Sequence, residues 1–175
     1  MDKIFTGILL ICLDLDFPLG SGVIGLLPDF AGYILVMRGI YSLEKDSRYL
    51  VKVWPWTVIM AAYTGILYGL KLLGILADDP FILWVLELAA MAAALAVQYG
   101  ILSGIRKMER QEGWDLQSDR LRILWLALAM VQGMGAALSW VPTVGIILTV
   151  AGWIVAVCFL IAFYRTKTWY QRNIH

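Results

Sequence analysis

The sequence lacks most of the side chains that hydrolases and metalloproteins use. Its only histidine is the last residue, His175, which argues strongly against an imidazole base or metal ligand inside the fold. Both cysteines, Cys12 and Cys158, lie in apolar runs, which indicates small buried side chains and not a disulfide framework or a metal site. The sequence has no phosphate-binding glycine loop and no cluster of metal-ligating residues. We therefore expect no cofactor and no metal.

Charged residues are also scarce. They form 15% of the 175 residues, whereas soluble domains carry about 25%, and 61% of the residues are hydrophobic. So few charges cannot cover the surface of a soluble globule, which makes a lipid bilayer the expected surroundings. The net charge of +1 argues against a nucleic-acid partner, because such proteins present a strongly basic surface.

Long apolar runs are what the sequence has instead. A helix needs about 20 apolar residues to cross a bilayer, and six runs approach that length. We therefore predict an all-α fold, an integral membrane bundle of six transmembrane helices in a single domain, residues 1–175. The expected helices cover about 3–17, 28–44, 53–76, 80–105, 119–139 and 142–164. The first is short and resembles a removable signal segment, but no small-residue cleavage site follows it, so we interpret it as a retained helix.

Lys and Arg residues are distributed unevenly around these spans. When the six helices alternate across the membrane, all 14 except Lys71 fall on one side. The positive-inside rule places this side, with both termini, in the cytoplasm. Tryptophans such as Trp54, Trp84 and Trp140 fall at span ends, where amphipathic rings prefer to lie. The predicted topology is therefore amino terminus in, carboxyl terminus in.

The first expected helix is interrupted at membrane depth. Asp14 and Asp16 end its apolar run, and Pro18 with the Gly-Ser-Gly run at 20–22 would break a helix. Irregular backbone at this depth is tolerated only inside protein or beside water, and broken helices form many transporter sites. Alternatively, the helix is simply short and both aspartates lie at the outer interface.

Three further polar side chains fall at a similar depth. At 1.5 Å per residue, Lys71, Glu87 and Gln132 lie about 10 Å below the outer surface. Polar groups so deep usually face the bundle interior or a cavity. One interpretation is a structural ion pair between Lys71 and Glu87. The other is an ion-binding site that these residues share with Asp14 and Asp16.

Enzymatic chemistry has little support in this set. Paired intramembrane aspartates can share a proton and hydrolyse bonds, but Asp14 and Asp16 are two residues apart and point to different sides of a helix. Ser21 has no histidine near it, and only a similar depth makes Lys71 conceivable as its base. We expect that the protein is not an enzyme.

Small residues recur at four-residue intervals in the expected third, fourth and fifth helices. This spacing lets helix backbones approach closely in lipid. We interpret it as packing within the bundle, with a homo-oligomer interface as the alternative. The residues are Ala61, Gly65 and Gly69; Ala92, Ala96, Gly100 and Gly104; and Ala129, Gly133 and Ala137.

Two segments carry a family resemblance. Gly-Leu-Leu-Pro-Asp-Phe-Ala-Gly-Tyr at 25–33 and Gly-Ile-Arg-Lys-Met-Glu at 104–109 resemble segments of a group of small uncharacterised bacterial multi-pass membrane proteins. The resemblance covers most of the chain. It implies a multi-pass protein of the bacterial inner membrane, without any activity or assigned residues.

Two functional hypotheses follow. The first is a small transporter-like protein for a cation or cationic solute, with a polar cavity facing outward. Its acidic residues would bind the cation and the others would tune the site: Asp14, Asp16 and Glu87, with Lys71 and Gln132. The second is a non-transporting interaction, assembly or regulatory protein that uses the basic cytoplasmic loop 106–122 to dock a soluble partner or anionic lipid headgroups. Ordinary topogenesis would also explain such a loop.

Overall fold

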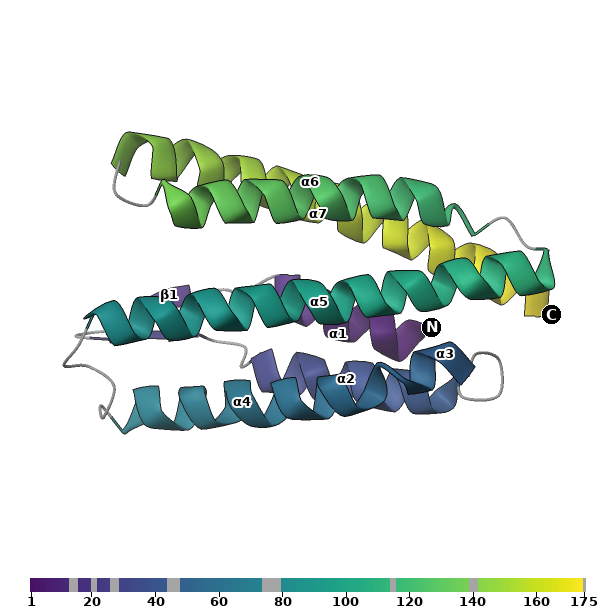
Figure 1. Cartoon of the computed structure of the whole chain (residues 1–175), viewed down its shortest axis with the longest axis horizontal. Helices are drawn as coiled ribbons and strands as arrows, with labels where there is room; N and C mark the ends of the chain where they lie inside the picture. The colour runs from purple at the N-terminus through teal and green to yellow at the C-terminus, as the bar shows by residue number, and fades with distance from the viewer. Residues whose placement is uncertain are drawn as a thin grey trace. The chain divides into compact units, whose positions relative to one another are not determined.

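The computed structural model describes residues 1–12, 16–19, 22–25, 29–43, 48–73, 80–113, 116–138 and 142–174. This part of the chain is helical apart from one short hairpin (Figure 1). It falls into two compact units, Met1–Gln98 and Tyr99–His175, and one helix contributes to both. The elements in order are α1 (Asp2–Cys12), β1 (Asp16–Leu19), β2 (Gly22–Gly25), α2 (Asp29–Ser42), α3 (Arg48–Val51), α4 (Trp54–Leu72), α5 (Pro80–Glu112), α6 (Ser118–Ala137) and α7 (Pro142–Ile174).

Three helical stretches are long and apolar enough to cross a membrane. They are Tyr49–Leu70, Trp84–Glu112 and Thr143–Arg172. On α7 the apolar side chains also face outward, with Ile146 68% and Ile154 60% exposed, as lipid contact requires. The prediction of a helical membrane protein is thus confirmed in its coarse form, and the count of six spans stays a prediction.

Most helix boundaries agree with the expected ones, but two helices are longer. Proline opens both α5 and α7, at Pro80 and Pro142, where its missing N–H costs nothing. However, α5 continues to Glu112 instead of ending near Ile105, and α7 continues to Ile174 instead of ending near Tyr164. The expected ends marked where the apolar pattern stops. Charged residues propagate a helix equally well outside lipid, so the hydrophobic pattern underestimated these helices.

The first helix is shorter than expected. It ends at Cys12, so the prediction of helix to residue 17 was wrong. Strands β1 and β2 follow as an antiparallel hairpin, which pairs Asp16 with Gly25 and Leu19 with Gly22. Proline cannot extend a helix here, whereas apolar β-branched and aromatic residues favour strands. In a two-stranded sheet both strands are edges, which is where a strand proline such as Pro18 is tolerated.

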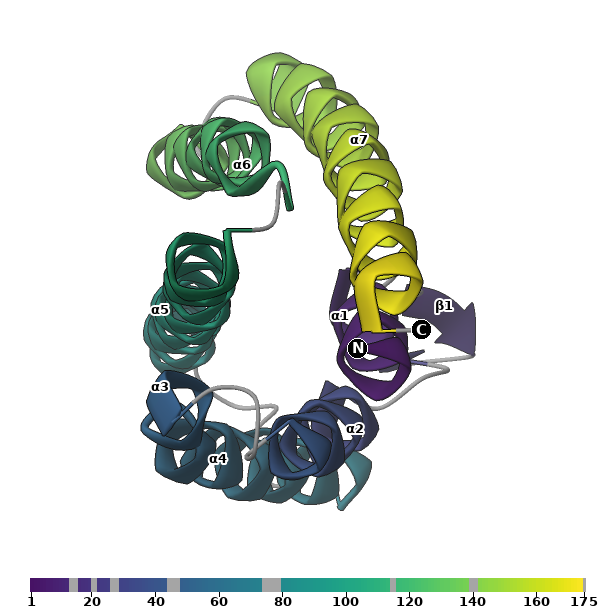
Figure 2. The ribbon, with the colours of Figure 1, turned by 90° about the vertical axis from the view of Figure 1, so that its right-hand side faces the viewer.

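In unit 1 the closest approach is between α1 and α2. A Cβ atom added at Gly7 would lie 2.5 Å from the carbonyl oxygen of Gly32, and one added at Gly39 would lie 2.8 Å from the backbone N of Ile4. The two backbones therefore touch, with only hydrogen atoms on the glycines between them. Viewed along the helices, α2 lies between α1 and α4 (Figure 2).

The small-residue seams expected from the sequence are not where this close packing occurs. Gly65 meets only the side chain of Phe30, at 3.7 Å, and neither Gly69 nor Gly133 has a described neighbour within 4 Å of an added Cβ. Among the described residues these two glycines make no close contact, so the role expected for them in packing stays a prediction. Packing is close where both partner helices carry glycine, as α1 and α2 do.

Unit 2 contains the end of α5 and the helices α6 and α7. The helices α6 and α7 pack along each other, and an added Cβ at Gly152 would lie 3.7 Å from Val131. The core is concentrated where the α5–α6 connection meets the second half of α7. Its fully buried side chains are Ile105, Met108, Leu116, Leu121, Phe159 and Phe163.

Candidate functional site

The five polar residues that the sequence singled out lie on different elements. Asp14 lies outside the described residues. Asp16 begins β1 and Lys71 lies in the last turn of α4, but the structure does not describe their side chains. Glu87 is an exposed residue of α5 in unit 1, and Gln132 is an exposed residue of α6 in unit 2. The Lys71–Glu87 ion pair and the shared ion site therefore stay predictions.

A polar cluster lies where α1 ends and α2 begins. An added Cβ at Gly32 would lie 2.7 Å from the side chain of Ile11, so the last turn of α1, with Cys12, packs beside the first turns of α2, with Asp29 and Tyr33. Cys12 is half-buried and Tyr33 is only 2% exposed. An acid, a thiol and a phenol thus lie in neighbouring turns, at the end of α1 and the start of α2.

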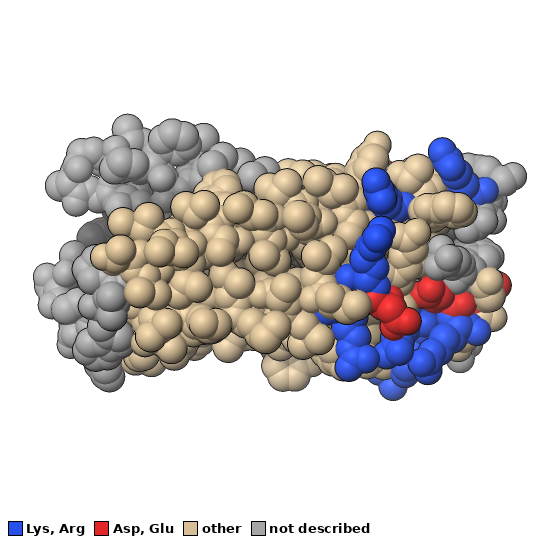
Figure 3. Space-filling model, turned by 90° about the horizontal axis from the view of Figure 1, so that it is seen from above, with Lys and Arg blue, Asp and Glu red and all other residues tan. Residues whose placement is uncertain are grey.

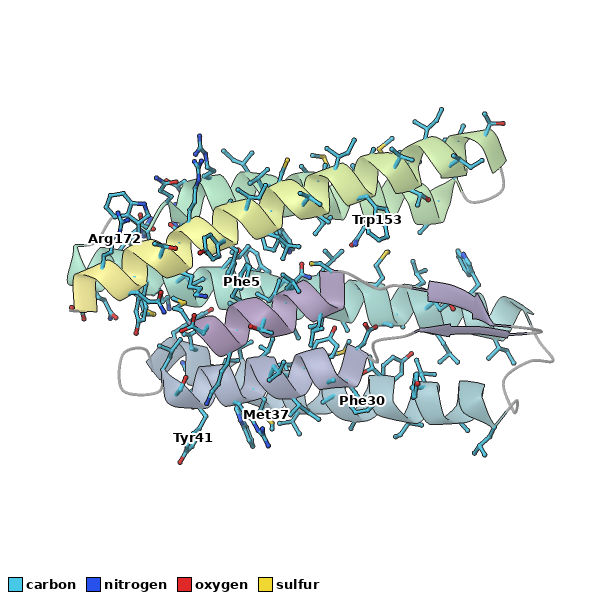
Figure 4. The ribbon with its side chains drawn as sticks, turned by 180° about the vertical axis from the view of Figure 1, so that it is seen from behind. Phe5, Phe30, Met37, Tyr41, Trp153 and Arg172 are labelled. Atoms are coloured by element: carbon cyan, nitrogen blue, oxygen red, sulfur yellow. The ribbon has the colours of Figure 1, made fainter. Side chains whose placement is uncertain are left out.

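Two contacts with α4 give the position of this cluster along the axis of that helix. Phe30, next to Asp29, packs edge-to-face on Tyr68, with ring centroids 6.0 Å apart, and its Cβ faces Gly65. Figure 4 shows Phe30 at the start of α2, on the side of α4. The cluster is therefore level with the second half of α4, and α4 continues beyond it to Leu72.

Glu87 lies at a comparable height. The hydroxyl of Tyr63 donates a hydrogen bond of 2.9 Å to the backbone carbonyl of Leu86, the residue before Glu87. Tyr63 stands midway along α4, about 3 Å from Gly65 and about 8 Å from Tyr68 along the helix axis at 1.5 Å per residue. The acids Asp29, on α2, and Glu87, on α5, thus lie at similar positions along the axis of α4 in unit 1. Both are near the middle of α4, a helix long enough to span a membrane.

This layer offers carboxylate and hydroxyl oxygens but not a preformed metal centre. Among the residues that the structure describes, no three His, Cys, Asp or Glu side chains are grouped so as to hold a metal ion. Oxygen donors of this type suit hard cations or the nitrogen of a cationic solute. Gln98, also on α5 in unit 1, is 7% exposed, and its Oε1 accepts no hydrogen bond from the described residues.

Two members of the cluster could have been found from the sequence. Asp29 and Tyr33 are four residues apart, which places them on one face of a helix. The sequence alone indicated Cys12 only as a small buried apolar side chain. Nothing local brings Cys12 to Asp29, because that proximity depends on the antiparallel pairing of α1 with α2.

A second polar region forms in unit 2, at the α5–α6 connection. Arg106 on α5 makes a salt bridge of 3.3 Å with Asp119 in the first turn of α6. The carboxylate of Glu109 accepts a 3.1 Å hydrogen bond from the backbone N–H of Ser118. The hydroxyl of Thr166, on α7, donates a 2.9 Å hydrogen bond to the carbonyl of Leu116. Specific contacts therefore join α5, the start of α6 and α7 through the described residues of this region.

The Thr166 hydroxyl gives a direct test of this junction. Thr166 is 1% exposed and Leu116 is fully buried, so Thr166→Val leaves the Leu116 carbonyl without this donor. We expect a loss of about 1–2 kcal/mol of unfolding free energy, measured by denaturant titration in detergent. The matched control is Thr149→Val on the same helix, whose exposed hydroxyl only bonds back to Gly145 and whose loss should change stability by under about 0.5 kcal/mol. Equal effects would show that the buried hydrogen bond is not significant.

Comparison with known proteins adds no further classification. No family model matches the chain, and no curated protein or solved structure is significantly similar to it. The molecule is therefore classified by its own features. It is a helical membrane protein with three helices long and apolar enough to span a bilayer, a polar cluster in unit 1 and a salt bridge between α5 and α6 in unit 2.

Proposed function

We propose that the protein is a small transporter-like protein that handles a cation or cationic solute through a polar cavity open to the outer side of a bacterial inner membrane. It crosses the membrane six times, with both termini in the cytoplasm. The proposal rests on one observation, the β1–β2 hairpin that follows the short helix α1 next to an acidic layer.

The hairpin matters because of its depth. Helix α1 has 11 residues and is about 16 Å long, which is about half of the 30 Å hydrocarbon core. The hairpin continues beyond it, at the end of unit 1 where α4 also ends (Figure 1). On the outer edge of each strand, backbone N–H and C=O groups form no hydrogen bonds with another described strand. Lipid cannot form these hydrogen bonds either. Protein or a water-filled cavity must cover these edges, and a cavity here would reach the acidic layer.

The acidic layer supplies the charge that such a cavity needs. Asp29 and Glu87 carry it on α2 and α5, and Asp14 and Asp16 precede or begin the hairpin strands. Acidic groups at membrane depth are costly unless they face a partner, a cavity or an ion. We assign these four acids to cation binding. In the same proposal Lys71 tunes the affinity.

The distribution of cations in each unit supports the topology. In unit 1 the contact of Gly39 with Ile4 puts the start of α1 beside the end of α2, so the exposed residues Lys3 and Arg38 share one end. In unit 2 the cations of α5, α6 and α7 gather around the Thr166–Leu116 hydrogen bond. Since cytoplasmic loops carry the excess of Lys and Arg, both ends are assigned to the cytoplasm.

The alternative function is that of a non-transporting interaction or assembly protein that uses residues 106–122. The observation in its favour is that three described residues of that segment, Arg106, Glu109 and Leu116, make specific contacts with neighbouring elements. A loop that serves topogenesis alone has no need of such contacts. The two functions predict different results in a flux assay.

Flux through proteoliposomes tests the proposal. We expect the wild-type protein to take up at least one of radiolabelled Na⁺, Rb⁺ and methylammonium above the level of protein-free vesicles. Asp29→Asn and Glu87→Gln each remove one acidic group from the layer and should lower that uptake about tenfold, because a lost charge contact at this depth is equivalent to more than 1 kcal/mol. Asp14→Asn and Asp16→Asn should lower it as well.

Asp2→Asn is the matched control for Asp29→Asn. Asp2 also lies in the first turn of a helix, so this change removes the same favourable charge from a helix N-terminus, at the opposite end of α1 from the cluster. Its uptake should equal that of the wild type. Absence of uptake of all three cations by well-folded wild-type protein would contradict the transporter proposal and favour the interaction protein. Unchanged uptake in both Asp29→Asn and Glu87→Gln would remove these residues from the mechanism.

A further inference from the structure

Exposed cations surround the end of unit 2 at which α5 ends, α6 begins and α7 ends. On the face shown in Figure 3, Lys and Arg side chains gather at one end and leave a long uncharged stretch beside them. We name this set of exposed residues the cationic rim. It consists of Lys107, Arg110, Arg120, Arg122, Arg165 and Arg172.

The acids of this region are engaged in contacts with other parts of the unit. Asp119 pairs with Arg106 at 3.3 Å, and Glu109 accepts the N–H of Ser118 at 3.1 Å. Glu112 is the remaining acid of the loop whose side chain the structure describes. Asp and Glu side chains lie among the cations on the face of Figure 3, but the six exposed cations of the rim outnumber the three described acids of the loop, so this end carries a net positive charge.

Apolar side chains are exposed directly beside the rim cations. Ile123, next to Arg122, is 67% exposed, and Tyr164, next to Arg165, is 53% exposed. The border between hydrocarbon and headgroups favours exposed apolar side chains and cations at the same level of a helix. Each of these cations therefore stands where an apolar span passes into the headgroup region.

The rim is held on a rigid support. Met108, Leu116 and Phe163 are fully buried beneath it, and the Thr166 hydrogen bond ties α7 to the α5–α6 connection. Five of its six cations are arginines, whose planar guanidinium groups bind phosphate oxygens in pairs. Arginines in fixed relative positions are better suited to a phosphate diester than flexible lysines are.

We propose that the cationic rim binds the headgroups of anionic phospholipids in the cytoplasmic leaflet that surrounds the protein. The apolar neighbours of the rim contact the acyl chains of the same lipids, so the ligand is a membrane lipid and not a soluble phosphate or an acidic protein. This inference depends on the membrane embedding of unit 2 and is independent of cation transport.

Lipid retention by the purified protein tests the inference. The full-length protein is purified from detergent that contains equal amounts of phosphatidylglycerol and phosphatidylcholine, and bound lipid is counted by native mass spectrometry. We expect the wild type to retain phosphatidylglycerol, and retention to fall as NaCl is raised. The double variant Arg120→Gln, Arg122→Gln should retain about tenfold less.

The matched control is the double variant Lys3→Gln, Lys52→Gln, which changes the net charge by the same amount in unit 1 and should retain phosphatidylglycerol like the wild type. Arg120→Lys with Arg122→Lys keeps the charge and should give an intermediate loss, because the paired guanidinium contacts are removed.

Retention in the Gln variant equal to that of the wild type would overturn the proposal. So would displacement of the lipid by millimolar glycerol phosphate, which would identify a site for soluble phosphates. If the Gln variant does not fold, the salt dependence of the wild type becomes the test. Phosphatidylglycerol retention that NaCl does not change would then refute the proposal.

Discussion

Replacing Gly7 by alanine is expected to lower the thermal unfolding temperature by about 4–8 °C, which corresponds to a loss of about 2 kcal/mol. The added Cβ would lie 2.5 Å from the carbonyl oxygen of Gly32 and 2.8 Å from the backbone N of Val36. Both are backbone atoms, so no side chain can rotate away to make room. The helices α1 and α2 must separate, and the buried contacts of Ile4 and Ile8 along this interface weaken.

Gly133→Ala is the matched control for this change. Gly133 is also a helical glycine in a predicted span, but an added Cβ has no described neighbour within 4 Å. Alanine favours a helix over glycine by about 1 kcal/mol, so this variant should unfold at the same temperature or a higher one. The measurement is thermal unfolding of detergent-purified protein, followed by tryptophan fluorescence. If Gly7→Ala also leaves the temperature unchanged or raises it, α1 and α2 do not pack as described.

The topology predicts that an impermeant thiol reagent labels cysteine at one end of unit 2 and not at the other. In a background in which alanine replaces Cys12 and Cys158, an impermeant thiol reagent added to intact cells should label cysteine at Thr143 and leave cysteine at Gln111 unlabelled. Both positions are exposed. Thr143 lies about 35 Å along α7 from Thr166, which contacts the α5–α6 connection next to Gln111. An apolar stretch long enough to cross a bilayer separates them.

Permeabilised cells provide the control for accessibility. After permeabilisation both cysteines should react, which shows that the Gln111→Cys thiol is not simply buried. Labelling of Gln111→Cys in intact cells to the level of Thr143→Cys would contradict the cytoplasmic assignment of the α5–α6 connection. The reversed pattern would invert the whole topology, and with it the outward direction of the proposed cavity.

Helix positions were largely predictable because lipid imposes a simple length rule. Apolar runs predicted the cores of α4, α5, α6 and α7, and prolines at 80 and 142 marked two starts. The ends of α5 and α7 were not predictable in this way. Beyond the apolar run a helix needs another source of stability, and here it comes from buried contacts such as those of Met108 and Tyr170.

The candidate site was predictable only in part. The sequence identified a break after the first apolar run and an acid at Glu87. It did not identify the hairpin, because each strand has only four residues and Pro and Gly lie in or beside both, so no alternating pattern marks them. It also missed the cluster of Asp29, Cys12 and Tyr33, since Cys12 reaches Asp29 only through the antiparallel packing of α1 on α2.

Composition and charge order by themselves determined that this is a helical membrane protein, because each residue contributes to hydropathy and to the sidedness of charge independently of its distant neighbours. Tertiary structure decided where backbones touch, at Gly7 and Gly32, and which polar groups share a level, such as Asp29 and Glu87. These features depend on pairs of residues far apart in the chain. Their positions are fixed by helix packing, and no local pattern in the sequence encodes it.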